Sequence, residues 1–596
     1  MQEYTTAGPI ELQDDDHLVQ PLIAHADDRP HAPLLSYRDG DRFVDLTTSD
    51  VWNRVQALAK GLIAIGIEPK QRVSIMSHTR LEWVLMDYAI LAAGGVTVPI
   101  YETSSTEQIE WIISDSGARA VVFEDSALKA KFDEVADGLD DCEHTFVIEE
   151  GGLEALIEAG KDVDDATLDE RLENISTDDL ATIIYTSGTT GRPKGCLLTH
   201  HNLRSNVLNT VQLIQEMITK DDSQLLFLPL AHSFAKILLL SSIEQGAKVG
   251  FNTEMDKLTE EMPMFEPTYL AAVPRIFEKV FTAAQQRAAA DGKGKIFDKA
   301  AEVAEQYSRE ERSGTVSLKT KTQHFVFDKL VYGKLRDVFG GQLKASNSGG
   351  GPLGERLAHF FNGIGVQVYE GYGLTETSPV LTSNRPDAWK IGTVGQPIPG
   401  TTIKIADDGE VLAKGPQIFQ GYYNNEEATS EAIDDDGWFH TGDIGELDDD
   451  GFLKITGRKK EIIVTAAGKN VAPAVLEDRI KRHRLVSQAM VVGDNRKFIG
   501  ALVTIDEETF PQWAEEHGKT GKSVADLTQD EELRAEVQQA IDDANQAVSR
   551  AESVREFRIL PQDFTVEGGE LTPTLKVKRR VVEDRYSEHI DDIYSG

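Results

Sequence analysis

Residues 72–101, RVSIMSHTRLEWVLMDYAILAAGGVTVPIY, contain two short apolar runs with a helical pattern between them. The runs at 72–76 and 97–101 have the length of buried strands, and the segment at 80–93 has the length of a helix. Two strands joined in this way form a right-handed crossover, and the resulting parallel sheet is covered on both faces. This stretch therefore predicts an α/β fold.

The same alternation continues toward the C-terminus. A helical pattern at 107–114 leads to a strand-like run at 118–123. Later strand-like runs, separated by helical segments, lie at 225–228, 247–251, 269–273, 343–346 and 366–369. We therefore expect doubly wound parallel sheets in the large N-terminal part of the chain.

The pattern changes in the second half of the chain. Residues 282–340 are polar and helical, with Ala-rich and Lys-rich stretches, and are predicted to form an inserted helical subdomain. From about 392 the hydrophobic period becomes two, and hairpin turns are predicted at Asp407-Asp408-Gly409 and at Asp450-Gly451. We expect a β-rich subdomain in this region.

Beyond Lys460 the sequence mixes helical and strand-like patterns and ends in a basic, strand-like run at 571–578. This change predicts a domain boundary, although no low-complexity linker marks it. The expected organisation is a large α/β domain over 1–459 and a small α+β domain over 460–596.

Composition limits the classes of protein to consider. The chain has 596 residues, too many for one hydrophobic core, and its 40% apolar and 27% charged residues are typical of a globular protein. Only Cys142 and Cys196 are present, which argues against a disulfide framework and indicates the reducing cytoplasm. The sequence shows neither a signal peptide nor an apolar run near the roughly 20 residues of a membrane-spanning helix.

The formal net charge is −39 at pH 7. The summed field of such a chain argues against non-specific binding to nucleic acid or to an anionic membrane surface. Substrates that are polyanions would need local basic islands. Three such islands are present, at 192–194, 458–460 and 576–580.

A loop rich in small polar residues follows the predicted strand at 180–185. It contains Thr186, Ser187, Gly188, Thr189, Thr190 and Gly191, followed by Arg192-Pro193-Lys194-Gly195. Backbone N–H and hydroxyl groups in such a loop can surround phosphate oxygens, and Lys194 adds a charge. The Walker loop is excluded because Pro193 and Gly195 occupy its required Gly and Ser/Thr positions and a strand follows. The remaining alternative is a surface turn.

A second group of candidate residues follows two later strands. Its members are Gly349, Gly350, Gly351 and Pro352 before a helix, then Glu370, Gly371, Tyr372, Gly373, Thr375 and Glu376. Ligands bind beyond the carboxyl ends of parallel strands. Glycines there allow close approach to a flat ring, on which Tyr372 could stack, and Thr375 could contact a phosphate. Glu376 could hold a hard cation, for which magnesium is the natural choice beside a triphosphate.

A third group lies in the β-rich region. Asp443 can accept hydrogen bonds from both hydroxyls of a ribose, and Arg458 can support the same sugar or a phosphate. The alternative for Glu376, as for any lone carboxylate, is a solvated surface position.

The string at 185–195 resembles the signature of the acyl-adenylate-forming (AMP-binding) superfamily, and further motifs follow in that family's order from about 30 to about 585. The block at 436–460 resembles the signature of fatty-acyl-CoA synthetases, and 98–105 resembles the bacterial long-chain branch. The block departs from that signature at Phe439, Leu447, Asp449 and Thr456-Gly457. These departures concern the subfamily and its acyl chain.

The resemblance implies a role for each group of residues. It places adenine at the glycine run and Tyr372, the α-phosphate at Thr375, and magnesium at Glu376 with Thr186. Lys576 aligns with the catalytic lysine, and Lys460 with the hinge of a mobile C-terminal domain. Two further sets follow from the same alignment: Gly468 and Lys469 on the path of coenzyme A, and His232, Phe234 and Gly350 at the acyl pocket, with lining expected near 232–237, 273–277 and 346–350.

The reaction implied is activation of a long-chain fatty acid by ATP and Mg²⁺ to acyl-AMP, with release of pyrophosphate, and then thioester formation with coenzyme A. Rival readings are an acyl-AMP ligase that loads a carrier protein, an aryl- or medium-chain acyl-CoA ligase, and a non-catalytic acyl-adenylate or nucleotide sensor. The expected partners are the fatty acid, ATP and CoA, without nucleic acid. Peripheral contact with a membrane and a homodimer stay open.

Overall fold

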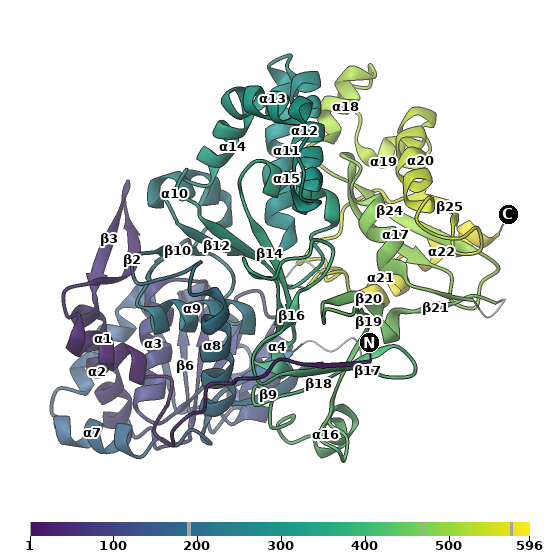
Figure 1. Ribbon diagram of the computed structural model, residues 1–596. Coiled ribbons are helices and arrows are strands. Elements are labelled where there is room, and N and C mark those ends of the chain that lie inside the picture. The colour runs from purple at the N-terminus through teal and green to yellow at the C-terminus, as the bar shows by residue number, and fades with distance from the viewer. Residues whose placement is uncertain (1, 187–191, 467–468, 573–575, 596) are drawn as a thin grey trace.

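The computed structural model describes residues 2–186, 192–466, 469–572 and 576–595. Two mainly parallel sheets form the large part of the molecule, and a C-terminal unit lies beside them (Figure 1). The α/β prediction is confirmed. None of the described helices is both long and apolar enough to cross a membrane.

The first sheet contains the strands that opened the sequence argument. In spatial order they are β7 (His144–Val147), β6 (Ala120–Phe123), β4 (Arg72–Met76), β5 (Val96–Ile100), β8 (Leu180–Thr186) and β9 (Lys194–Thr199). All neighbours are parallel except β8 and β9. Helix α3 (Leu81–Ala92) joins β4 to β5, and α4 (Thr106–Ser116) joins β5 to β6, as predicted.

Both faces of this sheet are buried, because alternate side chains of a strand point to opposite sides. In β6, Val122 belongs to the core beneath α3, whereas Val121 and Phe123 belong to a second core. That second core is closed by α4 and by α5 (Ser126–Asp133). The near-continuous apolar strands of the sequence are explained by this double burial.

The second sheet has nine strands and carries much of the candidate site. Their order is β16 (Gln396–Pro397), β15 (Val380–Ser383), β14 (Val368–Gly373), β13 (Ala345–Ser348), β12 (Tyr269–Ala272), β10 (Ser223–Leu226), β11 (Lys248–Phe251), β2 (Pro33–Asp39) and β3 (Arg42–Thr47). The six strands from β14 to β2 are parallel. Helices α8 (His200–Ile214), α9 (Ser233–Gln245) and α15 (Glu355–Gly363) pack on it.

The region predicted as a helical subdomain is helical, but it does not have a core of its own among the described residues. It comprises α11 (Pro274–Ala290), α12 (Gly294–Arg312), α13 (Leu318–Phe327), η4 (Asp328–Tyr332) and α14 (Gly333–Val338). Phe281 of α11 packs against Phe297 of α12 and Phe360 of α15, with ring centroids 5.5 and 4.8 Å away. These aromatic rings join the core of the nine-stranded sheet. The helical prediction for 282–340 is confirmed, and these helices share the core of the large part of the molecule.

The β-rich region is a five-stranded antiparallel sheet. Its order is β1 (Glu3–Thr5), β17 (Thr402–Ile405), β18 (Glu410–Lys414), β19 (Phe439–Leu447) and β20 (Leu453–Arg458). The pairing of Thr402 with Lys414 and of Leu447 with Leu453 confirms both predicted hairpins. The N-terminal strand β1 adds an edge that the sequence did not reveal.

The C-terminal unit begins at the short helix η6 (Lys459–Glu461). Its elements include β21 (Ile463–Val464), β22 (Asn470–Val471), α17 (Pro473–Ile480), β23 (Val486–Val492), β24 (Ile499–Ile505), α18 (Phe510–Glu516), α20 (Glu531–Asn545), β25 (Val554–Ile559), α21 (Arg579–Arg585) and α22 (Ser587–Tyr594). It has hydrophobic clusters of its own, one of them around the fully buried Trp513. The domain boundary itself stays a prediction.

The run at 571–578 is not a continuous strand, and this prediction is wrong. Leu571 forms an isolated antiparallel bridge with Val577, and the backbone N–H of Thr572 donates to the carbonyl of Lys576 at 2.8 Å. Leu571 and Val577 therefore pair with each other, and Lys576 lies in the irregular segment ahead of α21.

Candidate active site

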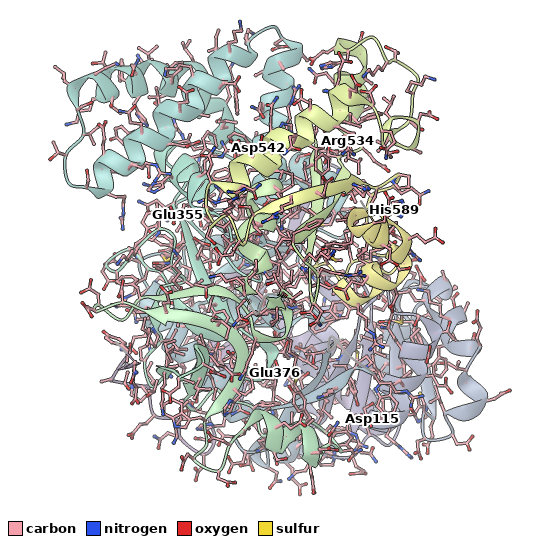
Figure 2. The ribbon with its side chains drawn as sticks, turned by 90° about the vertical axis from the view of Figure 1, so that its right-hand side faces the viewer. Asp115, Glu355, Glu376, Arg534, Asp542 and His589 are labelled. Atoms are coloured by element: carbon pink, nitrogen blue, oxygen red, sulfur yellow. The ribbon has the colours of Figure 1, made fainter. Side chains whose placement is uncertain are left out.

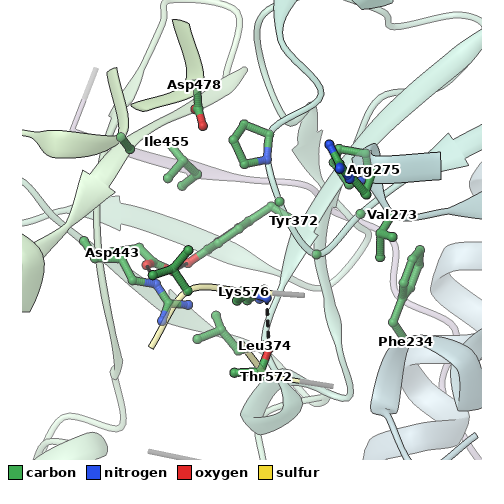
Figure 3. A pocket seen from close by; sticks show the side chains of 18 of the residues that line it. Phe234, Val273, Arg275, Tyr372, Leu374, Asp443, Ile455, Asp478, Thr572 and Lys576 are labelled. Atoms are coloured by element: carbon green, nitrogen blue, oxygen red, sulfur yellow. Dashed lines mark hydrogen bonds and ion pairs between the residues drawn. The ribbon is translucent and has the colours of Figure 1, made fainter. Parts of the chain in front are cut away.

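A cleft of about 3030 Å³ lies where the nine-stranded sheet, the five-stranded sheet and the C-terminal unit meet. The carboxyl ends of β13 and β14 open into it, as the sequence predicted for two parallel strands. Figure 3 shows part of its lining, with Tyr372 between Asp443 and the segment that carries Arg275. Candidate residues from each of the three sequence groups, as far as they are described, line this one cleft.

Asp443 is held by two other candidate residues. The Tyr372 hydroxyl donates to Asp443 Oδ2 at 2.6 Å, and Arg458 Nε lies 3.1 Å from Asp443 Oδ1. The pairing of β19 with β20 places Asp443 opposite Arg458. Burial raises the pKa of Tyr372, and the adjacent Asp443 carboxylate raises it further. The carboxylate is therefore oriented before any ligand arrives.

Glu376 and Thr186 both interact with Cys196. The Thr186 hydroxyl is 4.0 Å from Cys196 Sγ, and burial raises the pKa of Cys196, with the charge of Glu376 as the next cause. Glu376 Oε1 accepts a hydrogen bond from the hydroxyl of Tyr422 at 2.8 Å. Lys194 Nζ lies 5.0 Å from the centroid of the Tyr422 ring. Tyr422 thus joins the two motifs that the sequence treated separately.

The donors at Glu376 fit magnesium bound together with a triphosphate. Glu376 Oε2 has no hydrogen-bond partner within the described part of the chain, and the Thr186 hydroxyl is a second hard oxygen nearby. Among the described residues there is no cluster of three or more His, Cys, Asp and Glu side chains that could hold a metal alone. Mg²⁺ usually keeps several waters and is held by one or two carboxylates plus substrate phosphates, so this sparse donor set suits it.

The glycine run meets the predicted acyl side of the site. A Cβ added to Gly349 would lie 3.0 Å from the Phe234 ring, and Gly350 has a φ of +79°. Both positions therefore favour glycine, the first for close packing and the second for backbone conformation. Gly351, Pro352 and Gly371 also line the cleft.

Two other residues of this group have structural contacts. Glu370 is buried, accepts from the backbone N–H of Leu353 at 3.0 Å, and has a pKa raised to about 7 by burial. A Cβ on Gly373 would lie 1.7 Å from the carbonyl oxygen of Pro379. Gly373 is thus required by the packing of β14 against the chain leading into β15, whatever its contact with a nucleotide.

His232 begins helix α9. Its Nδ1 accepts from the backbone N–H of Phe234 at 3.1 Å, and burial lowers the pKa of the imidazole to about 4, with Lys576 as the second cause. Next to it, the Ser233 hydroxyl lies 3.2 Å from that of Thr375. The neutral histidine therefore adjoins Ser233, which contacts the residue predicted to bind the α-phosphate.

Lys576 enters the cleft from the irregular segment before α21 (Figure 3). Its backbone N–H donates to the Thr572 hydroxyl at 3.0 Å. The side chain is open to the cleft, but the cleft walls partly desolvate it and lower its pKa to about 8, helped by the charge of Arg458. The pKa of Lys576 is raised, to a smaller extent, by the negative charges of Asp443, Glu461 and Glu376.

The predicted acyl segments all contribute to the lining, and the structure adds residues that the sequence did not suggest. His232, Phe234 and Ile237 line the cleft, as do Val273 and Gly350. The additional residues come from α8, from the loop that follows it and from strands β10 and β12: Thr210, Ile214, Ile218, Gln224 and Tyr269. A buried apolar helix face looks the same in sequence whether it meets a core or a pocket.

Helix α4 contacts residues at both ends of the segment 185–195, which is predicted to bind phosphate. Trp111 Nε1 donates to the carbonyl of Pro193 at 2.8 Å, and the Arg192 guanidinium lies 4.8 Å from the Trp111 ring centroid. On the other side of the loop, the Tyr185 hydroxyl donates to Asp115 Oδ2 at 2.6 Å. Nothing in the sequence connects these residues with phosphate binding.

The residues predicted for the hinge and for the coenzyme A path differ in their positions. Lys460, in η6, lines the cleft, whereas Lys469 lies outside its described lining and forms an ion pair with Glu552 at 3.1 Å. Ser187, Gly188, Thr189, Thr190, Gly191 and Gly468 lie outside the described residues. Their proposed roles stay predictions.

Two family descriptions match the sequence. Residues 22–423 match the family described as AMP-binding enzyme, and residues 460–596 match the AMP-binding enzyme C-terminal domain. Among curated proteins, the long-chain-fatty-acid–CoA ligase FadD15 of Mycobacterium bovis is 47% identical, with 100% of both chains covered. The long-chain-fatty-acid–CoA ligase ACSBG2 of Xenopus laevis is 31% identical over 94% of this chain and 81% of that protein.

Solved structures show the same fold at low identity. The adenylation domain of a carboxylate reductase from Mycobacterium chelonae superposes with a TM-score of 0.76 at 22% identity, covering 97% of this chain and 91% of the other. ATP-bound MatB from Rhodopseudomonas palustris superposes with a TM-score of 0.68 at 23% identity, covering 97% of this chain and 99% of the other.

Proposed function

The chain belongs to the AMP-binding enzyme family, and on that premise we propose that it is a long-chain fatty-acid–CoA ligase. It activates the acid with ATP to an acyl-adenylate, releasing pyrophosphate, and then transfers the acyl group to the thiol of coenzyme A, releasing AMP. The observation that carries this proposal is the convergence of Lys576, Glu376 and Asp443, from different parts of the fold, on one cleft. The likeness to the mycobacterial ligases over the full length supports the choice of acid and acceptor.

In the first step a carboxylate oxygen attacks the α-phosphate, and both reactants are anions. With a pKa of about 8, Lys576 is mostly protonated at pH 7, and its ammonium group stabilises the charge that develops as pyrophosphate leaves. Thr375 is proposed to contact the α-phosphate beside His232. Because the pKa of His232 is about 4, its imidazole adds no positive charge next to the acid.

The nucleotide is proposed to bind along the edges of the two sheets. Asp443, oriented by Tyr372 and Arg458, accepts hydrogen bonds from the ribose hydroxyls. The glycine run and Tyr372 contact adenine, while Thr186, Lys194 and the intervening loop hold the phosphates. Mg²⁺ at Glu376 and Thr186 would neutralise phosphate charge when bound.

In the second step the thiol of coenzyme A must reach the acyl-adenylate, so the cleft must open a path to it. We propose that the C-terminal unit turns about Lys460 and withdraws Lys576. Among the described residues, one ion pair links the two units, between Arg275 and Asp506 at 3.7 Å. Figure 2 shows Glu376 lying well below α20, the helix on which Arg534 and Asp542 are labelled.

The test is an acid panel of graded chain length, scored for CoA-dependent release of AMP. A long-chain ligase gives the highest kcat/KM with long straight-chain acids and forms the thioester only when CoA is present. A preference for aryl or medium-chain acids would reject the long-chain assignment. Acylation of a carrier protein without use of CoA would favour an acyl-AMP ligase, and nucleotide binding without turnover would favour a sensor.

Cellular location and oligomeric state are two further proposals. We propose that the protein is cytoplasmic, because the thiols of Cys142 and Cys196 are free, as a reducing compartment would keep them. A homodimer is a second proposal, and sedimentation of the purified chain tests it.

A further inference from the structure

The outermost helix of the large domain carries an exposed apolar face. On α13 and η4, Leu318, Phe325, Val326 and Leu330 are 81, 61, 48 and 58% exposed. They are four of the ten large hydrophobic side chains that are exposed in the described chain, and they fall within 13 positions. Their spacing places them on one side of the helix. Figure 1 shows α13 at the upper edge of the molecule.

The opposite side of this segment is anchored. Thr320 and Tyr332 are buried, and the Tyr332 hydroxyl donates to the carbonyl of Ala300 at 2.7 Å. The His324 ring stacks on Tyr307 with centroids 3.9 Å apart, and its Nε2 lies 2.6 Å from the carbonyl oxygen of Gly363. The exposed face is therefore presented by an ordered element, and its apolar side chains are not those of a frayed end.

Basic side chains surround the apolar ones. Lys319, Lys321, Lys329 and Lys334 are exposed, and Lys329 Nζ lies 4.7 Å from the Phe325 ring centroid. The one acidic residue between 318 and 336 is Asp328, and its carboxylate is paired with Arg336 at 2.8 Å. A chain of net charge −39 thus has a local surface that is both apolar and cationic. We call residues 318–334 the α13 face.

We propose that the α13 face docks on an anionic lipid membrane. Leu318, Phe325 and Leu330 enter the headgroup layer, and the lysines meet lipid phosphates. A helix with apolar and Lys-rich surface lies in the interface plane, bound by apolar burial and by attraction to anionic lipid. The negative net charge does not prevent this, because charges farther away than the screening length, about 8 Å at physiological ionic strength, are largely screened.

Other occupants of this face suit it less well. A symmetric contact with a second copy would place the four lysines of one chain against the same four of the other. An acidic protein would complement the lysines, and the experiment includes that case. The proposal does not depend on the reaction of the cleft.

The experiment measures binding of the full chain to vesicles by co-sedimentation. We compare phosphatidylcholine vesicles with vesicles that also contain phosphatidylglycerol. The wild type should bind the anionic vesicles more tightly and release them at high salt. Lys319→Gln with Lys321→Gln should weaken binding roughly 25-fold, since each lysine near an anionic surface contributes about five-fold. Phe325→Ser with Leu330→Ser should weaken it at least about ten-fold.

Matched controls come from elsewhere on the surface. Lys497→Gln with Lys522→Gln removes the same charge, and Met255→Ser removes a side chain that is 50% exposed. Neither should change vesicle binding. In addition, Phe325→Trp should show quenching by brominated lipids beyond that of the wild type.

Four results would overturn the proposal. They are no binding of the wild type to anionic vesicles, equal weakening by the control variants, binding to polyglutamate as tight as to vesicles, and a dimer that the Phe325→Ser/Leu330→Ser variant dissociates. All variants are compared with the wild type for thermal unfolding, so that loss of fold is recognised separately.

Discussion

Lys576 lies close enough to His232 for its charge to lower the pKa of the imidazole, although one residue belongs to the C-terminal unit and the other begins α9 of the large domain. The same lysine also interacts electrostatically with Asp443 and Glu376. One side chain thus faces the predicted acyl, ribose and metal positions together. This is the arrangement that adenylation requires, because acid and phosphate meet at a single point.

Removing this lysine should separate the two half-reactions. Loss of one preorganised charge-stabilising group costs about 10²–10³ in rate. Lys576→Ala should therefore lose roughly that factor in adenylate formation but transfer a supplied acyl-adenylate to CoA at nearly the wild-type rate. Lys578→Ala, which removes the same charge two positions away, should be mild in both assays. Equal slowing of both half-reactions by Lys576→Ala would assign the lysine to folding or nucleotide affinity.

The pH profile of adenylation should report the same group. The pKa of Lys576 is lowered from its ordinary value to about 8, and the protonated form is the active one. The rate should therefore hold below pH 8 and fall as the pH rises through that value. Lys576→Arg should move this limb to higher pH, because a guanidinium stays protonated. An unchanged limb in that variant would assign the titration to another group.

The Mg²⁺ dependence of adenylate formation should report the hydrogen bond between Tyr422 and Glu376. Tyr422→Phe removes the 2.8 Å hydrogen bond to the carboxylate. A hydrogen bond to a charged group contributes about 1.5–3 kcal/mol, so the Mg²⁺ concentration for half-maximal adenylation should rise about ten-fold or more. Glu376→Gln should show a larger rise, with part of the activity recovered at high Mg²⁺. Tyr423→Phe is the matched control, and an equal effect there would contradict the assignment.

Support of the phosphate loop by α4 predicts an effect on ATP affinity. Trp111→Phe removes the hydrogen bond to Pro193 and reduces the ring beneath Arg192. The lost neutral hydrogen bond is worth about 1 kcal/mol, so KM for ATP should rise about five-fold. KM for CoA should not change. Trp52→Phe, on α2 (Thr48–Ala64), serves as control, and a fall in kcat without a change in KM for ATP would argue against this role.

Restricting the hinge should spare adenylation. Lys460→Pro fixes φ at about −65°, which should hinder rotation of the C-terminal unit. Adenylate formation should stay near the wild-type rate, while transfer from supplied acyl-adenylate to CoA should slow. This is the reverse of Lys576→Ala. A variant that loses adenylation alone would place the pivot elsewhere.

Most strands of the two parallel sheets, helices α3 and α4 and the helical region at 282–340 could be predicted from the sequence, whereas β1, β2 and β3 were not predicted. At β4, α3 and β5, the hydrophobic pattern and the length of each segment were sufficient to predict the element. A segment that is buried on both faces is apolar throughout. The resemblance to the AMP-binding superfamily predicted one site for Asp443, Arg458 and Glu376, and all three line the same cleft. Local errors arose where tertiary contacts decide, as in the predicted strand-like run at 571–578, whose Leu571 and Val577 instead pair with each other in an antiparallel bridge.

Several contacts between residues that are far apart in the sequence could not be predicted and are seen in the structure alone. Tyr422 bonds to Glu376, Trp111 to Pro193, and α8 lines the cleft, yet each of these residues reads in sequence as an ordinary loop or core position. The position of Lys576 depends on the orientation of the C-terminal unit. The physical reason is that periodicity reports whether a segment is buried, whereas its neighbours are set by how sheets, helices and domains pack together over long stretches of chain.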